Sequence, residues 1–430
     1  MLDRTAPPPI QPIQFIPFPK VNCHTLSKGV KLYCIQHGKQ PIVELQVVFQ
    51  GGYCFEQLPG VSLFTPKMMN EGTKSYSSAA LSEQFDFYGV SLGIETGFET
   101  IRFSLSSLEK QLQQTLPVLQ EILVCPTFPE DEFNLMITRS KQAIQVDTRK
   151  SSYWARRLSG HLIWGKNHPY GRHIGEAELS PIELSQLIDY HKETFHTNNL
   201  TLIAVGHFDE DTLVRQCDNM VSQLPVWETN TVSAGLNPPE AEKPGVIYHP
   251  VSDTMQSTIR IALPLFKRNH PDYHTLRLAN TLFGGFFGSR LMKNIREEKG
   301  YTYGIGSSLQ CYKYNGMWII QTETAHEYVS KTLTEIELET VRLQQELVPK
   351  AELEIAANYL LGRMLSNQET PFQISDLFLT QWVNSLSDED WKEAYEIVRS
   401  ITPEDIQRVC QKYLNINEMR IVVSGIAGEN

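Results

Sequence analysis

Hydrophobic and polar positions along this 430-residue chain alternate between short strand-like segments and longer amphipathic ones. Residues 43–50, 100–105 and 200–205 are strand-like in the first half, and residues 257–263, 306–312 and 317–322 in the second. Helical spacing predicts helices over 109–123, 328–346 and 351–365, the first opened by a capping box from Ser106 to Glu109. The two kinds of element do not alternate regularly, which favours an α+β fold with helices on one face of largely antiparallel sheets.

One local pattern occurs twice, about 220 positions apart, over residues 180–206 and 402–425. Each copy opens with a Ser or Thr suited to cap a helix, Ser180 or Thr402, followed by Pro at the first helical position and an acid at the third. Each copy also ends in an apolar strand closed by Gly. The repeat predicts two homologous domains of the same fold.

A polar stretch rich in turn residues separates the two copies of the pattern. We therefore expect an N-terminal domain over 1–228, a linker over 229–244 and a C-terminal domain over 245–430. Such a linker would let one half of the molecule move against the other.

Composition narrows the class of protein. The formal net charge of −11, with no basic stripe to offset it, argues against a nucleic-acid partner. Seven cysteines without a Cys-x-x-Cys pair fit reduced thiols better than a disulfide framework. No signal peptide or membrane span is visible, so we expect a cytoplasmic protein that does not associate with a membrane.

The most informative stretch is a predicted junction between a helix and a strand. Apolar spacing over 289–299 predicts the helix, Gly300 suits a left-handed C-cap, and 301–306 alternates like a strand. Arg296 in the last helical turn and Tyr303 on the strand could donate hydrogen bonds to a single carbonyl oxygen. The alternative is a solvated cation near a helix C-terminus and a core aromatic, and the spacing alone favours that alternative.

The residues around this junction carry a resemblance to a known family. Phe-Gly-Gly-Phe-Phe-Gly-Ser-Arg-Leu at 283–291 and Ile-Arg-Glu-Glu-Lys-Gly-Tyr-Thr-Tyr at 295–303 are similar to the C-terminal signature of the M16 (pitrilysin/insulinase) zinc peptidases. In that family the matching Arg and Tyr hold the substrate backbone and the developing oxyanion, so the resemblance implies these roles for Arg296 and Tyr303. It also implies two facing α+β domains of the LuxS/MPP-like metallohydrolase fold.

The family's inverted zinc motif, His-x-x-Glu-His, lies on a helix that follows a Gly and precedes a Gly-Thr pair. The stretch from Gly60 to Gly72 supplies this frame with other contents. Leu63 stands at the first His position, Pro66 at the Glu and Lys67 at the second His. None of these side chains can act as the missing ligand or base, because zinc requires imidazole, thiolate or carboxylate donors.

No replacement for the zinc ligands is evident elsewhere. The family's third ligand would fall within 139–148, where Asp147 is the one acid and is out of register. We interpret the closely spaced histidines as surface, cap or turn residues unsuited to zinc: His168 and His173, His191 and His196, His270 and His274. We therefore expect this chain to hold no metal itself.

The Gly-rich run at 284–288 is best explained as a tight connection between two helices, where Gly relieves steric conflict. A phosphate-binding loop is not expected, because no Lys-Ser or Lys-Thr pair follows. The run also carries Phe286 and Phe287, which we keep as candidate substrate contacts.

In some pairs of M16 chains of this length, one subunit carries zinc and the general base while the other carries the Arg and Tyr. The resemblance implies that this chain is the second kind, similar to the alpha-type subunits of mitochondrial processing peptidase and to two-subunit bacterial M16B peptidases. Zinc is then expected in a partner subunit, with a peptide as substrate. The main alternative is a catalytically inactive scaffold or peptide-binding protein, and a peptidase with unfamiliar ligands is the weakest candidate. Whether the chain forms a homodimer when its partner is missing is left open by the sequence.

Overall fold

A computed structural model describes residues 12–226, 236, 238–387 and 389–428 of the chain. The end of the predicted N-terminal domain at 228 and half of the predicted linker, residues 229–235 and 237, lie outside the described residues. What is described consists of two sheets with helices packed around them, as expected for an α+β fold.

Six strands form the sheet of the first half, in the order β1-β2-β6-β3-β5-β4. Neighbouring strands are antiparallel except β2 and β6, which are parallel. Their bounds are β1 (Val21–Thr25), β2 (Lys31–Gln36), β3 (Ile42–Gln50), β4 (Ser91–Thr96), β5 (Thr100–Leu108) and β6 (Leu200–Gly206).

Five strands form the sheet of the second half, in the order β7-β11-β8-β10-β9, and its one parallel pair is β7 with β11. This order repeats β2-β6-β3-β5-β4, and the repeated sequence pattern ends in β6 and β11, which occupy the same place in the two sheets. The predicted repeat is therefore confirmed. The bounds are β7 (Gly245–Pro250), β8 (Gln256–Leu265), β9 (Thr302–Cys311), β10 (Gly316–Ala325) and β11 (Arg420–Gly425).

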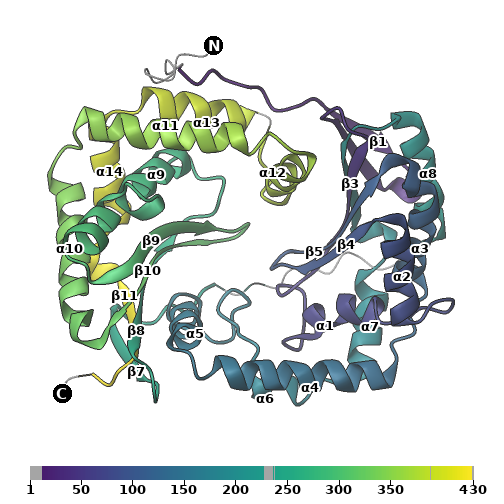
Figure 1. Cartoon of the computed structure of the whole chain (residues 1–430), viewed down its shortest axis with the longest axis horizontal. Helices are drawn as coiled ribbons and strands as arrows, with labels where there is room; N and C mark the ends of the chain where they lie inside the picture. The colour runs from purple at the N-terminus through teal and green to yellow at the C-terminus, as the bar shows by residue number, and fades with distance from the viewer. Residues whose placement is uncertain (1–11, 227–235, 237, 388, 429–430) are drawn as a thin grey trace, which may run out of the picture.

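Most helices lie on the outer faces of the sheets, and the two sheets face each other across the molecule (Figure 1). In the first half the helices are α1 (Val61–Met69), α2 (Ser78–Tyr88), α3 (Leu112–Val124), α4 (Glu130–Asp147), α5 (Ser151–Trp164), α6 (Glu176–Leu179), α7 (Leu184–Thr194) and α8 (Glu210–Gln223). In the second half they are α9 (Tyr273–Asn280), α10 (Val329–Gln345), α11 (Lys350–Ser366), α12 (Pro371–Val383), α13 (Glu389–Ser400) and α14 (Pro403–Tyr413).

Two helices cross over to the opposite sheet. Helix α12 packs on β3 and β6, where its Ile374 and Phe378 contact an apolar cluster of the first sheet (Figure 1). Helix α5 packs on β8 and β11, with Ala155 and Leu162 against Val422. Each half thus covers the inner face of the other sheet, and burial of these apolar side chains stabilises the arrangement of the two halves.

The structure corrects two predicted helix starts. Strand β5 continues through Ser106, whose hydroxyl donates to Glu44 on β3, so no capping box forms there and α3 begins at Leu112. Cross-strand pairing outweighs the local capping preference at this position. Likewise α7 begins at Leu184 rather than after Ser180. The predicted cap at Thr402 is confirmed, since its hydroxyl accepts a hydrogen bond from the backbone N–H of Asp405, the third residue of α14.

Over the described part of the chain, every helix is too short or too polar to cross a lipid bilayer.

Candidate functional site

The junction between helix and strand is formed as predicted, but the helix is wider than an α-helix. Residues Met292–Glu298 form a π-helix, η5, with Ile295 fully buried and a backbone bond from Lys299 N–H to the carbonyl of Asn294 at 3.0 Å. Gly300 then takes the left-handed conformation, with φ of 67°, and β9 starts at Thr302. π-helical turns are rare and frequent at functional sites, and this one presents Arg296 in its last turn.

A β-bulge follows at the start of β9. On the paired strand β10, Ile305 lies opposite Thr322 but Thr302 lies opposite Thr324. Strand β9 therefore has one residue more than β10 over this interval, and the interval contains Tyr303. Bulges redirect side chains and are common beside active sites. Tyr303 is 91% exposed, so the alternative that it is a core aromatic is wrong.

Hydrogen bonds from one hydroxyl hold the bulge. Thr302 Oγ1 donates to the backbone carbonyl of Glu323 at 2.6 Å and accepts from the N–H of Gly304 at 3.1 Å. These bonds involve Thr302 and Gly304, the residues directly before and after Tyr303. Because the backbone around Tyr303 is fixed in this way, its exposed side chain starts from a defined position.

Arg296 is oriented by an aromatic ring rather than by an acid. Its guanidinium carbon lies 4.6 Å from the ring centroid of Phe287, which is 62% exposed, a cation–π arrangement. Phe286 differs, because its half-buried ring packs against Tyr359 at 4.9 Å. Of the two candidate phenylalanines, Phe287 accordingly lies beside Arg296 and Phe286 belongs to the packing. Within the described residues, no hydrogen bond joins Arg296 to Tyr303.

The glycine-rich connection before η5 has the structural role expected of it. A Cβ on Gly284 would lie 2.8 Å from the backbone nitrogen of Ser307 in β9, closer than real Cβ atoms approach. Glycine is therefore required at 284 for the helical segment η4 (Thr281–Gly285) to pack against β9.

Helix α1 occupies the place of the family's zinc helix, and its side chains do not fit a metal. Leu63 is half-buried against the first hydrophobic core, Pro66 is buried and Lys67 is exposed. An alkyl chain, a pyrrolidine ring and an ammonium group provide none of the donors that zinc requires. Asp147, at the end of α4, instead forms an ion pair with Lys150 at 2.7 Å.

The structure around α1 is adapted to its sequence. Pro66 has no N–H to bond the carbonyl of Ser62 four residues earlier, and that carbonyl accepts a hydrogen bond from Thr96 Oγ1 at 3.0 Å instead. The polar group freed by proline is thus satisfied by the neighbouring strand β4.

A buried carboxylate holds the N-terminus of α1. Glu56 Oε2 accepts from the N–H groups of Gly60 and Ser62 at 3.1 and 3.0 Å and from Ser62 Oγ at 2.7 Å. Arg172 lies 3.8 Å from the other carboxylate oxygen. Burial raises the pKa of Glu56 above its ordinary value, although these hydrogen bonds act to lower it. The helix is therefore firmly anchored even though it carries no zinc ligands.

Three of the paired histidines, His168, His196 and His274, are buried. His168 lies in a turn and His196 is the N-cap of the short helix Thr197–Asn199, as the prediction allows, whereas His274 lies inside α9. His274 pairs with Asp390 through Nε2 at 3.1 Å, a partner more than a hundred positions away that sequence spacing does not reveal.

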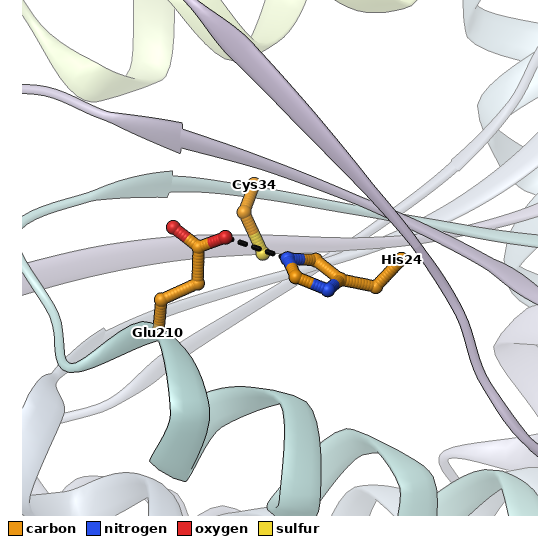
Figure 2. Close-up of side chains that lie close together, drawn as sticks. All are labelled: His24, Cys34 and Glu210. Carbon is orange, nitrogen blue, oxygen red and sulfur yellow. Dashed lines mark hydrogen bonds and ion pairs between the residues drawn. The ribbon is translucent and has the colours of Figure 1, made fainter.

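A further group of potential metal ligands was missed by the sequence analysis. His24 on β1, Cys34 on β2 and Glu210 at the start of α8 bring their ligand atoms within 4.8 Å of one another (Figure 2). His24 Nε2 is 2.6 Å from Glu210 Oε1, and Asn22 Nδ2 donates to both carboxylate oxygens. Only the tertiary structure reveals this group, because Glu210 is far from His24 and Cys34 in the sequence and lies on a helix packed beside their strands.

The chemistry of this group fits a structural polar cluster better than a metal site. Burial, followed by the charge of Glu210, raises the pKa of the Cys34 thiol to about 12, whereas metal binding needs the thiolate. The Glu210 carboxylate is already bonded and lies in the first turn of α8, where the helix dipole favours an anion over a cation. We therefore assign this group a structural role, in which it attaches the edge strand β1 to α8.

Tyr303 also lines a cavity with a volume of about 620 Å³. It lies between α5 and the inner face of the second sheet, and its wall includes the bulge residues Thr302 and Gly304. Arg296 does not line it. The structure therefore places Tyr303, but not Arg296, in the wall of this cavity.

Comparison with known proteins agrees with this geometry. A family model described as "Insulinase (Peptidase family M16)" matches residues 33–164, and one described as "Peptidase M16 inactive domain" matches residues 181–360. A crystal structure of a peptidase M16 inactive domain from Pseudomonas fluorescens has the same fold, with a TM-score of 0.85 over 95% of this chain and 98% of that chain at 23% sequence identity.

Three relatives show the range of names in the family. An "Uncharacterized zinc protease" of Rickettsia felis is 24% identical, over 95% of this chain and 98% of its own length. The "Non-peptidase homolog YmxG" of Helicobacter pylori is 23% identical, over 77% and 76%. A "Probable mitochondrial-processing peptidase subunit beta" of Schizosaccharomyces pombe is 21% identical, over 92% and 89%.

The two family models follow one another along the chain and together cover most strands of both sheets. The repeated sheet order, the helix frame from Gly60 to Gly72 and the junction at Arg296 and Tyr303 fit the same assignment. This chain belongs to the M16 peptidase family, and it lacks that family's zinc ligands on α1.

Proposed function

We propose that this chain is the non-zinc subunit of a two-chain M16-type peptidase, in which Arg296 and Tyr303 bind the peptide backbone and stabilise the oxyanion. The observation that carries the proposal is the state of Tyr303. It is 91% exposed at a bulge held by hydrogen bonds, and its hydroxyl has no partner within the described residues. Folding gains little from such an arrangement, and local departures of this kind are typical of functional sites.

The two side chains offer hydrogen-bond donors of complementary kinds. The Tyr303 hydroxyl offers one hydrogen-bond donor at the rim of the cavity, and the Arg296 guanidinium offers several in a planar fork. Phe287 restricts Arg296 without neutralising its charge. Donors fixed before substrate binds can stabilise a negative oxygen as it forms, which is how oxyanion sites lower a barrier.

The missing chemistry has to come from another chain. Since Leu63, Pro66 and Lys67 provide neither zinc ligands nor a general base, a partner M16 subunit with an intact His-x-x-Glu-His motif would supply both. Relatives named as a non-peptidase homolog and as a processing-peptidase subunit support a role of this kind.

The proposal is tested by co-expressing this chain with such a partner and assaying an internally quenched peptide. Neither chain should be active alone, and the purified pair should cleave. Tyr303→Phe and Arg296→Ala should each lower kcat about 100-fold in the pair, the effect of removing one oxyanion donor. Tyr248→Phe, on the opposite edge strand β7, and Arg399→Ala, an exposed arginine on α13, are matched controls that should retain activity.

Three results decide between this function and its alternatives. An active pair in which both variants are fully active would remove the catalytic role of Arg296 and Tyr303. A stable pair that binds peptide without cleaving it would identify a peptide-binding scaffold instead. Stoichiometric zinc in this chain alone, measured by elemental analysis, would contradict the assignment of the metal to the partner.

A further inference from the structure

The cavity beside Tyr303 contains an arginine in an unusual state. Arg260 on β8 is 9% exposed, and its Nη1 donates to Gln321 Oε1 at 2.7 Å. Its Nε is buried without a hydrogen-bond partner, and no described carboxylate pairs with it. Buried arginines are almost always paired with an acid, because an unpaired buried charge is costly. The second sheet therefore carries a positive charge that the described structure leaves uncompensated.

A second arginine increases the positive charge in the same cavity. Arg156 belongs to α5, the helix that crosses to the second sheet (Figure 1). Its side chain lines the cavity and forms no ion pair with the described residues. Burial, followed by the nearby charge of Arg156, lowers the pKa of Arg260 to about 10. Arg260 remains protonated at neutral pH, so two like charges are held together.

The position of Arg156 is set by contacts between α5 and β8. Ser151, the first residue of α5, places its hydroxyl 2.8 Å from Thr258 Oγ1. Thr258 is two positions before Arg260 on β8, and both residues line the cavity. The two arginines are therefore brought together by the crossing of α5 onto the opposite sheet.

Acidic groups do not offset this charge. The one acid that lines the cavity is Glu323, which is exposed and accepts from Thr258 Oγ1 at 3.4 Å. Further along α5 are Arg157, which pairs with Glu178 at 3.5 Å, and His161. Positive charge thus exceeds negative charge in this cavity, although the whole chain has a net charge of −11.

We propose that this cavity binds a carboxylate group of the peptide substrate, with Arg260 and Arg156 as its partners. The carboxylate would be the C-terminus of the peptide or an Asp or Glu side chain. An anion between the arginines would remove their mutual repulsion and compensate the buried charge of Arg260. This inference rests on the proposed function and adds to it a preference for acidic peptides. The carboxylate would be recognised in the cavity that Tyr303 also lines.

The cavity has the size for such a ligand. A volume of about 620 Å³ is within the range of small-molecule and peptide sites, roughly 300–1,000 Å³. Apart from Arg156, Arg260 and Glu323, the side chains that line the cavity are neutral. Hydroxyl and amide groups, such as Thr258 and Gln321, provide further hydrogen-bond partners for a peptide backbone.

Isothermal titration calorimetry with the purified full chain tests this inference. The ligands are four acetylated, alanine-rich hexapeptides that carry Glu or Gln at the last position and a free or amidated C-terminus. We expect peptides with a carboxylate to bind about tenfold or more tightly than the amidated Gln peptide, as expected for hydrogen bonds to a charged group. Comparison of the Glu amide with the free Gln peptide identifies which carboxylate is recognised.

Variants test whether the arginines carry this preference. Arg156→Ala, at an exposed position, and Arg260→Gln should each reduce the ratio of acidic to neutral affinity about tenfold. Arg399→Ala, on α13, should leave the ratio as it is. Equal affinity for acidic and neutral peptides, absence of binding by any of them, or an unchanged ratio in Arg156→Ala would overturn the inference.

The outcomes for the two proposals are distinguishable. A catalytic pair that cleaves acidic and neutral peptides with equal kcat/KM would overturn the carboxylate site and leave the proposed function standing. Carboxylate-dependent binding by this chain, together with no activity in any pair with a zinc-binding partner, would support the site and contradict the proposed function.

Discussion

The two halves of this chain contain sheets with the same strand order, but one equivalent region differs between them. Between the strands β3 and β4 of the first half lie α1 and α2, and between β8 and β9 of the second half lie α9, η4 and η5. The first region is closed, with Leu63 and Pro66 withdrawn into packing. The second is open and presents Arg296 and the exposed Tyr303.

This difference shows that a fold can be retained while a site is lost. A helix packs through its apolar face and its satisfied ends, and these are kept in α1 by its core residues and by Glu56. Metal ligands contribute to function but not to that packing. The second region departs from regular structure through a π-helix and a bulge, which are the features that expose Arg296 and Tyr303.

The strongest way to disturb the closed half is to remove its helix cap. Glu56→Ala leaves two N–H groups and one hydroxyl of α1 without their buried acceptor, so the free energy of unfolding should fall by about 3 kcal/mol. Urea denaturation monitored by circular dichroism measures the change. Glu83→Ala, an exposed residue on α2, is the control and should change stability little.

The same carboxyl group predicts a pH effect with a definite sign. Because burial raises the pKa of Glu56 in the folded chain, the folded state binds more protons than the unfolded state between the unfolded and folded pKa values. Its contribution to stability is present below the unfolded pKa and is lost as pH rises through the folded pKa. The free energy of unfolding of Glu56→Gln should lack this pH-dependent contribution. Identical profiles of stability against pH for the variant and wild type would contradict the prediction.

The open half should be sensitive to the hydroxyl that holds its bulge. Thr302→Val keeps the shape of the side chain but removes the bonds to the Glu323 carbonyl and the Gly304 N–H. In the active pair kcat should fall about tenfold, because Tyr303 loses its fixed position. Ser308→Ala, an exposed position on the same strand, should not change kcat. A normal kcat in Thr302→Val would show that the bulge does not position Tyr303.

The smallest expected effect concerns the proline in α1. Thr96→Val removes the hydroxyl that bonds the Ser62 carbonyl freed by Pro66, so unfolding should require about 1 kcal/mol less. In the background of Pro66→Ala the helix can satisfy that carbonyl itself, and the cost of Thr96→Val should shrink. A double-mutant cycle by urea denaturation measures this coupling, and strict additivity would refute it.

Much of the architecture could be predicted because it rests on local patterns. The apolar strands β3, β6, β8 and β10 and the helices α10 and α11 lie close to the predicted positions. The left-handed Gly300 and the cap at Thr402 were also predictable, since each depends on a few neighbouring residues. The predicted cap at Ser106 was wrong because strand pairing with β3, a non-local interaction, determines the structure there.

The candidate site shows the same division. Arg296 and Tyr303 were identified by motif, but their spacing favoured a solvated cation and a core aromatic. Exposure of Tyr303 depends on the register between β9 and β10. The pair of arginines at 156 and 260 has no sequence signal, because α5 reaches β8 only by crossing between halves.

The sequence by itself determined what this chain cannot do on α1, since the chemistry of Leu63, Pro66 and Lys67 excludes zinc ligation in any conformation. It also determined the two-fold repeat, because capping residues and apolar strands are local signals. Only the tertiary structure decided that α5 and α12 exchange sheets and that Arg260 is left buried without an acid. These features depend on packing and strand register between segments far apart in the chain, which local propensities do not encode.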